Sequence, residues 1–202
     1  SSRTVEEIRT FVGADTLEYL SVGKMLECVA NPQDFCTGCF TGDYPAAIAA
    51  AQTAISLAQA IQDGSSQATG YLRWGQTLWC QAELEAARMR LEQALNMAQS
   101  AGARAVEADS LRNLGIVVHI MGDYAGARIY YEQAMLIYHE LGNREGESKT
   151  LNNLGVISIL LGDYAGAKTY LELGLRICND TGRRGGEGIM LANLGLLFHN
   201  MG

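Results

Sequence analysis

The sequence repeats itself every 40 residues, and this period restricts the fold more than any other feature. An Asn-Leu-Gly tripeptide at 113–115 recurs at 153–155 and again at 193–195. The hexapeptide Gly-Asp-Tyr-Ala-Gly-Ala at 122–127 returns unchanged at 162–167. A fixed period of this length is the signature of a repeat architecture. We therefore expect similar units stacked along one axis.

Each unit is expected to form two antiparallel helices. Apolar side chains recur at helical spacing in residues 104–121, and Gly122-Asp123 then ends that pattern. A second amphipathic pattern starts at Tyr124 and stops at Leu141-Gly142. The turn between them is short, so the two helices must pack antiparallel. Both prolines lie in the first quarter of the chain, and no strand pattern is evident. The predicted fold class is all-α, an α-solenoid of antiparallel helix pairs.

A glycine returns inside the first helix of each unit. Glycine in a helix interior costs roughly 1 kcal/mol relative to alanine, so its repeated presence needs a reason. Close approach of the second helix of the unit is the expected reason. The positions concerned are Gly75, Gly115, Gly155 and Gly195.

Several positions of one unit stand at the spacings of the tetratricopeptide pattern: Leu111, Leu114, Gly115, Val118, Ala127, Tyr131 and Ala134. The unit resembles the 40-residue version of this repeat found in kinesin light chains and in regulators of G-protein signalling. The resemblance covers residues 44–202, with helical repeats at about 44–62, 66–101, 104–141, 144–181 and 184–201. It implies a superhelix with a concave groove, and hence a non-catalytic scaffold that binds a protein or peptide.

Residues 1–45 differ from the repeats and contain the string Cys36-Thr37-Gly38-Cys39-Phe40-Thr41-Gly42-Asp43-Tyr44-Pro45. This segment resembles the C-terminal end of glutamine phosphoribosylpyrophosphate amidotransferase. In the cluster-containing branch of that family, the matching cysteines are two of four thiolate ligands of an iron–sulfur cluster. The resemblance thus makes Cys36 and Cys39 a candidate ligand pair. The family's other two ligands, its nucleophilic cysteine and its phosphoribosylpyrophosphate loop have no match here. We expect no cofactor and no enzymatic activity from this chain, although its parent protein could be such an enzyme.

Charge and cysteine usage argue against several classes of partner. The formal net charge is −7 and no basic run exists, which disfavours nucleic acids and acidic membranes. No stretch approaches the roughly 20 apolar residues that span a bilayer. Five cysteines, three of them near the start, make a poor disulfide framework. A reducing, cytoplasmic location is expected.

The resemblance implies that the first helix of each pair lines the groove. Asn113, Asn153 and Asn193 then form a ladder whose carboxamides could bind a peptide backbone. Alternatively, they could stabilise the stack by binding neighbouring turns. Arg73 and Arg112 would favour an acidic ligand. The complete set of predicted groove residues is Arg73, Gln76, Trp79, Arg112, Asn113, Ile116, His119, Asn152, Asn153, Val156, Asn193 and Leu196.

The last predicted helix, residues 184–201, has no second helix after it in this sequence. Its apolar face, with Leu191, Leu194 and Phe198, is expected to be uncovered. Either the native protein continues or this end packs on another copy, and an open head-to-tail contact could propagate into a filament. The glycine-rich segment 182–188 is interpreted as a flexible joint rather than a phosphate site. The sequence is thus compatible with three functions: an interaction scaffold, an accessory region of an amidotransferase, and a self-assembling repeat protein.

Overall fold

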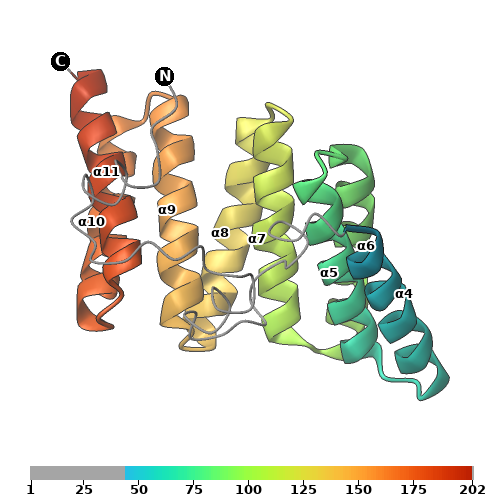
Figure 1. Cartoon of the computed structure of the whole chain (residues 1–202). Helices are drawn as coiled ribbons and strands as arrows, with labels where there is room; N and C mark the ends of the chain where they lie inside the picture. The colour runs from blue at the N-terminus through green and yellow to red at the C-terminus, as the bar shows by residue number, and fades with distance from the viewer. Residues whose placement is uncertain (1–43, 202) are drawn as a thin grey trace, which may run out of the picture.

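The computed structural model describes residues 44–201, and every regular element in that range is an α-helix (Figure 1). The all-α prediction is confirmed for this part of the chain. The helices are α4 (Tyr44–Ala60), α5 (Gly64–Cys80), α6 (Leu84–Ala101), α7 (Arg104–Ile120), α8 (Tyr124–Glu140), α9 (Arg144–Leu160), α10 (Tyr164–Asp180) and α11 (Arg184–Met201).

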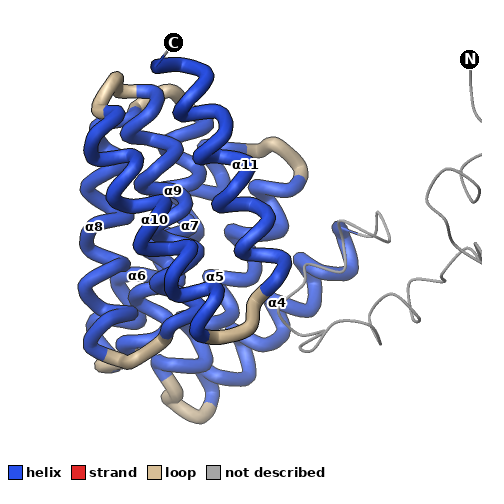
Figure 2. The backbone as a smooth tube through the Cα atoms, turned by 90° about the vertical axis from the view of Figure 1, so that its left-hand side faces the viewer, coloured by secondary structure: helices blue, strands red, loops and turns tan. Residues whose placement is uncertain are grey.

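The helices pair as hairpins that stack side by side. Helices α5 and α6, α7 and α8, and α9 and α10 form three complete pairs, with α4 and α11 at the two ends. Figure 2 looks along the stack and shows α6 and α8 on one side, with α5 and α11 on the other. Each first helix also contacts the first helix of the next pair, α5 with α7, α7 with α9, and α9 with α11. The first helices therefore form one continuous layer.

The turns between helices are built from the same residues in successive units. Gly122 has a φ of 92°, in the left-handed region that favours glycine. Asp123 then caps α8, because its carboxylate accepts a hydrogen bond of 2.8 Å from the amide of Gly126. Asp163 caps α10 in the same way, at 2.9 Å from the amide of Gly166. The repeated hexapeptide is thus a helix-stop and helix-start signal.

The recurrent glycines do allow close helix contact, except in the last unit. A Cβ on Gly75 would lie 2.7 Å from Leu91 Cγ, and one on Gly115 would lie 2.5 Å from Tyr131 Cε1. A Cβ on Gly155 would lie 2.6 Å from Leu171 Cγ. At Gly195, by contrast, no described atom lies within 4 Å of this position. The prediction fails there because, within the described residues, no second helix follows α11.

The uncovered face of α11 is smaller than the sequence suggested. Leu191 is 51% exposed and Phe198 is 53% exposed, as expected. Leu194, however, is only 9% exposed, since it packs in a cluster that includes Ile159 and Leu171. The preceding pair therefore covers part of the face that was predicted to be open.

A buried glutamate helps to join the second and third complete pairs. Glu147, near the start of α9, is 1% exposed. Its carboxylate lies 2.6 Å from Nη1 of Arg144 on the same helix and 2.8 Å from Nδ1 of His139 at the end of α8. Glu107 occupies the equivalent position on α7 and pairs with Arg104 at 2.7 Å. A buried carboxylate that keeps such partners avoids most of its desolvation cost.

Candidate functional site

A cavity of about 360 Å³ opens in the layer of first helices, between α7, α9 and α11. We call it the central site. Four of the predicted groove residues line it: Arg112, Ile116, Asn152 and Asn153. The cavity lies in the size range of ligand-binding clefts. The remaining lining residues are Ser148, Lys149, Cys178, Arg183, Gly185, Gly186, Ile189 and Met190.

Three of the six Ser, Asn, Lys and Arg side chains that line the central site are cationic. Lys149 Nζ lies 2.8 Å from a Glu145 carboxylate oxygen, and Arg183 Nη2 lies 2.7 Å from the same oxygen. The hydrogen bond from Lys149 lowers the pKa of Glu145. Arg183 Nη1 is buried and has no hydrogen-bond partner among the described residues. The site therefore keeps donor capacity that its own residues do not use.

The sequence left two interpretations of the asparagine ladder, peptide binding and stabilisation of the stack, and its three members differ in this respect. Asn193 Nδ2 donates to Asn152 Oδ1 at 2.7 Å, which links α11 to α9. Asn113 is 5% exposed, and its Nδ2 donates to the carbonyl of Asp109 at 2.7 Å within α7. Asn153 is the ladder member that lines the cavity. Two of the three thus make hydrogen bonds inside the solenoid, and one faces the open site.

The predicted residues on α5 lie apart from the central site. Arg73 is exposed, and its Nη1 donates to Gln76 Oε1 at 3.3 Å. Arg73 also lines a separate cavity of about 440 Å³ between α4 and α5. Trp79 is partly buried and packs against the core cluster that contains Leu72.

Three further predicted residues do not line the central site. His119 is half-buried and meets the ring of Tyr124 edge to face, with 5.7 Å between the ring centroids. Burial lowers the pKa of His119, which favours its neutral form. Val156 is partly buried on α9, and Leu196 is 48% exposed on α11.

The metal prediction falls outside the structure, because Cys36 and Cys39 precede the described residues. Within residues 44–201, no three His, Cys, Asp or Glu side chains are grouped so as to hold a metal ion. In the same range, none of the helices has the length and apolar character needed to cross a membrane.

Sequence reasoning missed most of the α9–α11 half of the site. Lys149 stands one helical turn before Asn152 and Asn153, so helical spacing alone could have added it. Arg183, Gly185 and the adjacent Gly186 lie in the glycine-rich segment that was interpreted as a joint. That segment does connect two units, but it also forms a wall of the cavity. No signal within a single unit marks it as a wall, since the cavity arises between units.

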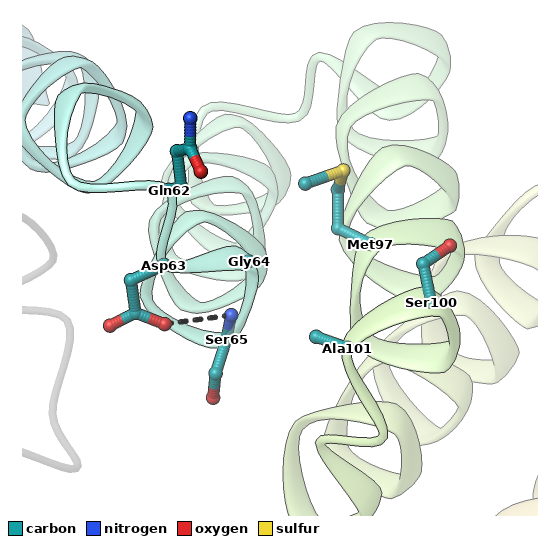
Figure 3. A pocket seen from close by; sticks show the side chains of 7 residues that line it. All are labelled: Gln62, Asp63, Gly64, Ser65, Met97, Ser100 and Ala101. Atoms are coloured by element: carbon teal, nitrogen blue, oxygen red, sulfur yellow. Dashed lines mark hydrogen bonds between the residues drawn. The ribbon is translucent and has the colours of Figure 1, made fainter.

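A further cavity of about 420 Å³ lies at the outer end of the stack, between the α4–α5 turn and the end of α6 (Figure 3). Its acidic residue is Asp63, whose carboxylate accepts a hydrogen bond of 3.0 Å from the amide of Ser65. That carboxylate also bonds Ser66 and caps α5. The carboxylate of this cavity is thus already used to start a helix.

Comparison with known proteins agrees with the helical repeats. Residues 106–180 match the family model described as tetratricopeptide repeat. The apo form of RapI has a similar structure, with a TM-score of 0.74 and 16% identity over 95% of this chain and 68% of that one. BtubC from P. vanneervenii gives a TM-score of 0.72 with 21% identity, covering 98% of this chain and 80% of the other. Putative kinesin light chain repeats of Podosopora anserina give 0.65 with 14% identity, covering 81% of each chain.

A second similarity concerns a short stretch of sequence. Amidophosphoribosyltransferase of Methanothermobacter thermautotrophicus is 52% identical over 46 residues, and that of Bacillus subtilis is 47% identical over 53 residues. These stretches are 22% and 24% of this chain. They amount to only 10% and 11% of the two enzymes, so the chain spans about a tenth of the length of these curated relatives. The resemblance to this enzyme family is confirmed as a local one.

The repeat spacing, the paired helices, the family match and the structural neighbours all agree. The described residues form an α-solenoid of paired helices, and residues 106–180 within it match the tetratricopeptide repeat family.

Proposed function

We propose that this chain is a non-catalytic interaction scaffold that binds a peptide or helix of a partner protein at the central site. The cavity between α7, α9 and α11 is the observation that carries the proposal. It lies in the layer of first helices, which lines the inner surface of solenoids of this kind. It also combines apolar side chains with polar groups that can fix the orientation of a ligand.

The charges around the cavity favour a partner segment with acidic residues. Arg112, Lys149 and Arg183 all line the site, whereas the whole chain has a formal net charge of −7. A local cationic site on an acidic protein attracts acidic segments selectively. The side chain of Asn153 can add hydrogen bonds to the backbone of the bound segment.

A peptide-display selection with the intact chain as bait tests the proposal. We expect the enriched peptides to lose about tenfold in affinity on Lys149→Ala, because one charged hydrogen bond is worth about 1.5 kcal/mol or more. Lys168→Ala is the matched control. Lys168 is also a helix lysine paired with a glutamate four residues away, but it lies on α10, and it does not line the cavity. Equal peptide affinities of the Lys149→Ala and Lys168→Ala variants would contradict the proposal, because the peptide would then bind away from the central site.

A second candidate function rests on the amidophosphoribosyltransferase similarity. We propose as an alternative that the repeats serve as an accessory or assembly region for such an enzyme of purine synthesis. The 52% identity over 46 residues favours it. Co-purification with a phosphoribosyltransferase, or its presence on the same polypeptide, is the expected result. A gene that encodes neither, together with no binding to the purified enzyme, would exclude this function.

The remaining expectations stay proposals of the same kind. We propose a cytoplasmic location, and self-association through α11 as a third function. The exposed Leu191 and Phe198 support self-association, since both are apolar and about half exposed. Light scattering is expected to show an average molecular mass of the wild-type chain that rises with concentration. The Phe198→Glu variant is expected to keep the mass of a monomer at all concentrations. A monomer at all concentrations would rule self-association out.

A further inference from the structure

Two successive repeat junctions share seven lining positions but differ in how they are filled. The Tyr138 junction lies between α7 and α9, and the Cys178 junction lies 40 residues later between α9 and α11. The cavity at the Tyr138 junction measures about 140 Å³, against about 360 Å³ at the Cys178 junction. Every residue that lines the smaller cavity has its counterpart, 40 residues on, in the lining of the larger one. The seven pairs are Asp109 and Lys149, Arg112 and Asn152, Tyr138 and Cys178, Asn143 and Arg183, Glu145 and Gly185, Gly146 and Gly186, and Lys149 and Ile189.

A phenol ring fills the first of these junctions. Tyr138 is 1% exposed, and its hydroxyl donates to Asp109 Oδ1 at 2.5 Å. The same hydroxyl accepts a hydrogen bond of 3.3 Å from Arg112 Nε. The ring lies directly against Gly146, where a Cβ would overlap it. An aromatic ring at this junction thus needs a glycine beneath it and polar groups at its far end.

The second junction keeps the glycine but lacks the ring. Cys178 replaces the tyrosine, and its Sγ lies 2.7 Å from the place of a Cβ on Gly186. Polar groups again stand where the hydroxyl partners stood, now as Lys149 and Asn152. Ile189, which is 56% exposed, adds apolar surface to the same cavity, and Met190, which is 2% exposed, lies beneath it. The ring that fills the Tyr138 junction therefore has no counterpart at the Cys178 junction, where the larger cavity lies above a thiol that is itself 1% exposed.

From this correspondence we infer that the Cys178 junction is a binding seat for a tyrosine side chain of the partner. The seat consists of Cys178, Gly186, Ile189 and Met190, with Lys149 and Asn152 at its polar end. The partner's ring lies over Gly186 as Tyr138 lies over Gly146, with the buried Cys178 and Met190 beneath it. Its hydroxyl is within the reach of Lys149 and Asn152. The inference deepens the scaffold function proposed above and rests on it.

Methyl NMR with p-cresol, the tyrosine side chain as a free molecule, tests the seat without any partner. Ring-current shifts are expected at the Met190 and Ile189 methyl groups. No shifts are expected at Met89, an exposed methionine on α6 outside the cavity. Toluene, which lacks the hydroxyl, is expected to bind about three- to tenfold more weakly, the value of one hydrogen bond. Toluene binding as tightly as p-cresol would contradict a tyrosine-specific seat.

Two substitutions complete the test. Cys178→Tyr fills the seat from within, so the variant is expected to fold and to show no shifts with p-cresol. Cys178→Ala leaves the seat open and is expected to retain the shifts. A Cys178→Tyr variant that unfolds, or that still binds p-cresol, would overturn the inference, as would a wild-type chain with no shifts. Because p-cresol requires no partner, binding in the seat together with a failed peptide selection would contradict the scaffold function alone.

Discussion

The Tyr138 and Cys178 junctions share seven lining positions, but only the glycine at 146 and 186 keeps its residue type. At the first, a buried tyrosine joins α7 to the next unit through Asp109 and Arg112. At the second, a cysteine stands in the place of the tyrosine, and the cavity, which five further residues line, is more than twice as large. The comparison teaches that substitutions at equivalent repeat positions, with tyrosine to cysteine among them, can accompany a change from a filled junction to a larger cavity.

The largest effect is expected from opening the closed junction. Tyr138→Cys removes a ring that is 1% exposed and leaves Asp109 without its hydroxyl partner. By analogy with other aromatic truncations in cores, the free energy of unfolding should fall by about 3–5 kcal/mol. Urea denaturation followed by circular dichroism measures this loss.

Cys178→Tyr is the matched control for that variant, and it should cost little or even stabilise the fold. A loss below about 1 kcal/mol for Tyr138→Cys would mean that the ring contributes far less than its burial implies. The two junctions would then not differ as described.

The next effect distinguishes the two glycines. Gly146→Ala places a methyl group against the Tyr138 ring, and such overpacking costs about 1–3 kcal/mol. Gly186→Ala meets the Sγ of Cys178, which ends a short side chain beside an open cavity. We therefore expect a smaller loss of stability there, with loss of p-cresol binding. Thermal unfolding of the pair checks this, and equal losses would contradict it.

The fold was largely accessible from the sequence, whereas the site was accessible only in part. The roles of Gly115 and Asp123 can be explained within one unit. Gly115 allows the second helix to pack closely, and Asp123 caps that helix. The 40-residue period then predicts the same roles at the equivalent positions of the other units. The cavity depends instead on two units together. From the sequence alone, Cys178 is interpreted as an ordinary buried thiol and Arg183 as part of a joint. Only the comparison with Tyr138, the equivalent residue one repeat earlier, relates Cys178 to the cavity.

Differences from the periodic pattern therefore indicate the cavity better than the pattern itself does. The predicted groove residues follow the repeat, and only Arg112, Ile116, Asn152 and Asn153 line the cavity. Asn113 illustrates why, since it keeps the repeat position but uses its amide inside α7. A residue type and a helical position do not settle whether a side chain faces a ligand or its own helix.

A third, smaller effect concerns the polar end of the seat. In the Cys178→Tyr background, Lys149→Asp should recreate the acid that Asp109 supplies to Tyr138. One hydrogen bond of this kind adds about 0.5–1.5 kcal/mol to the free energy of unfolding. Lys149→Asp in the wild-type background is the control and should bring no such gain. If the change has the same effect in both backgrounds, the new hydroxyl does not reach position 149.

The smallest effect is expected from Glu145, which holds Lys149 and Arg183. Glu145→Gln should release both cations and strengthen binding of an acidic peptide by about two- to fivefold, the value of an exposed ion pair. Isothermal titration calorimetry measures this change. An unchanged affinity would show that the carboxylate does not compete with the ligand.

The carboxylate of Glu145 also makes the stability of the folded chain depend on pH, and the direction of this dependence can be predicted. Because the pKa of Glu145 is lowered, mainly by Lys149, its ion pairs stabilise the folded chain at neutral pH. That contribution is lost as the pH falls through the lowered pKa. Acid unfolding of Glu145→Gln should therefore show less pH dependence than the wild-type chain in this range.

A crystal structure of the Cys178→Tyr variant tests the central claim most directly. The account predicts a ring that lies over Gly186 inside the former cavity, with its hydroxyl near Lys149 and Asn152 and with α9 and α11 unmoved. A ring turned out to solvent, or an α11 displaced from α9, would contradict the claim that the open junction is shaped for a tyrosine.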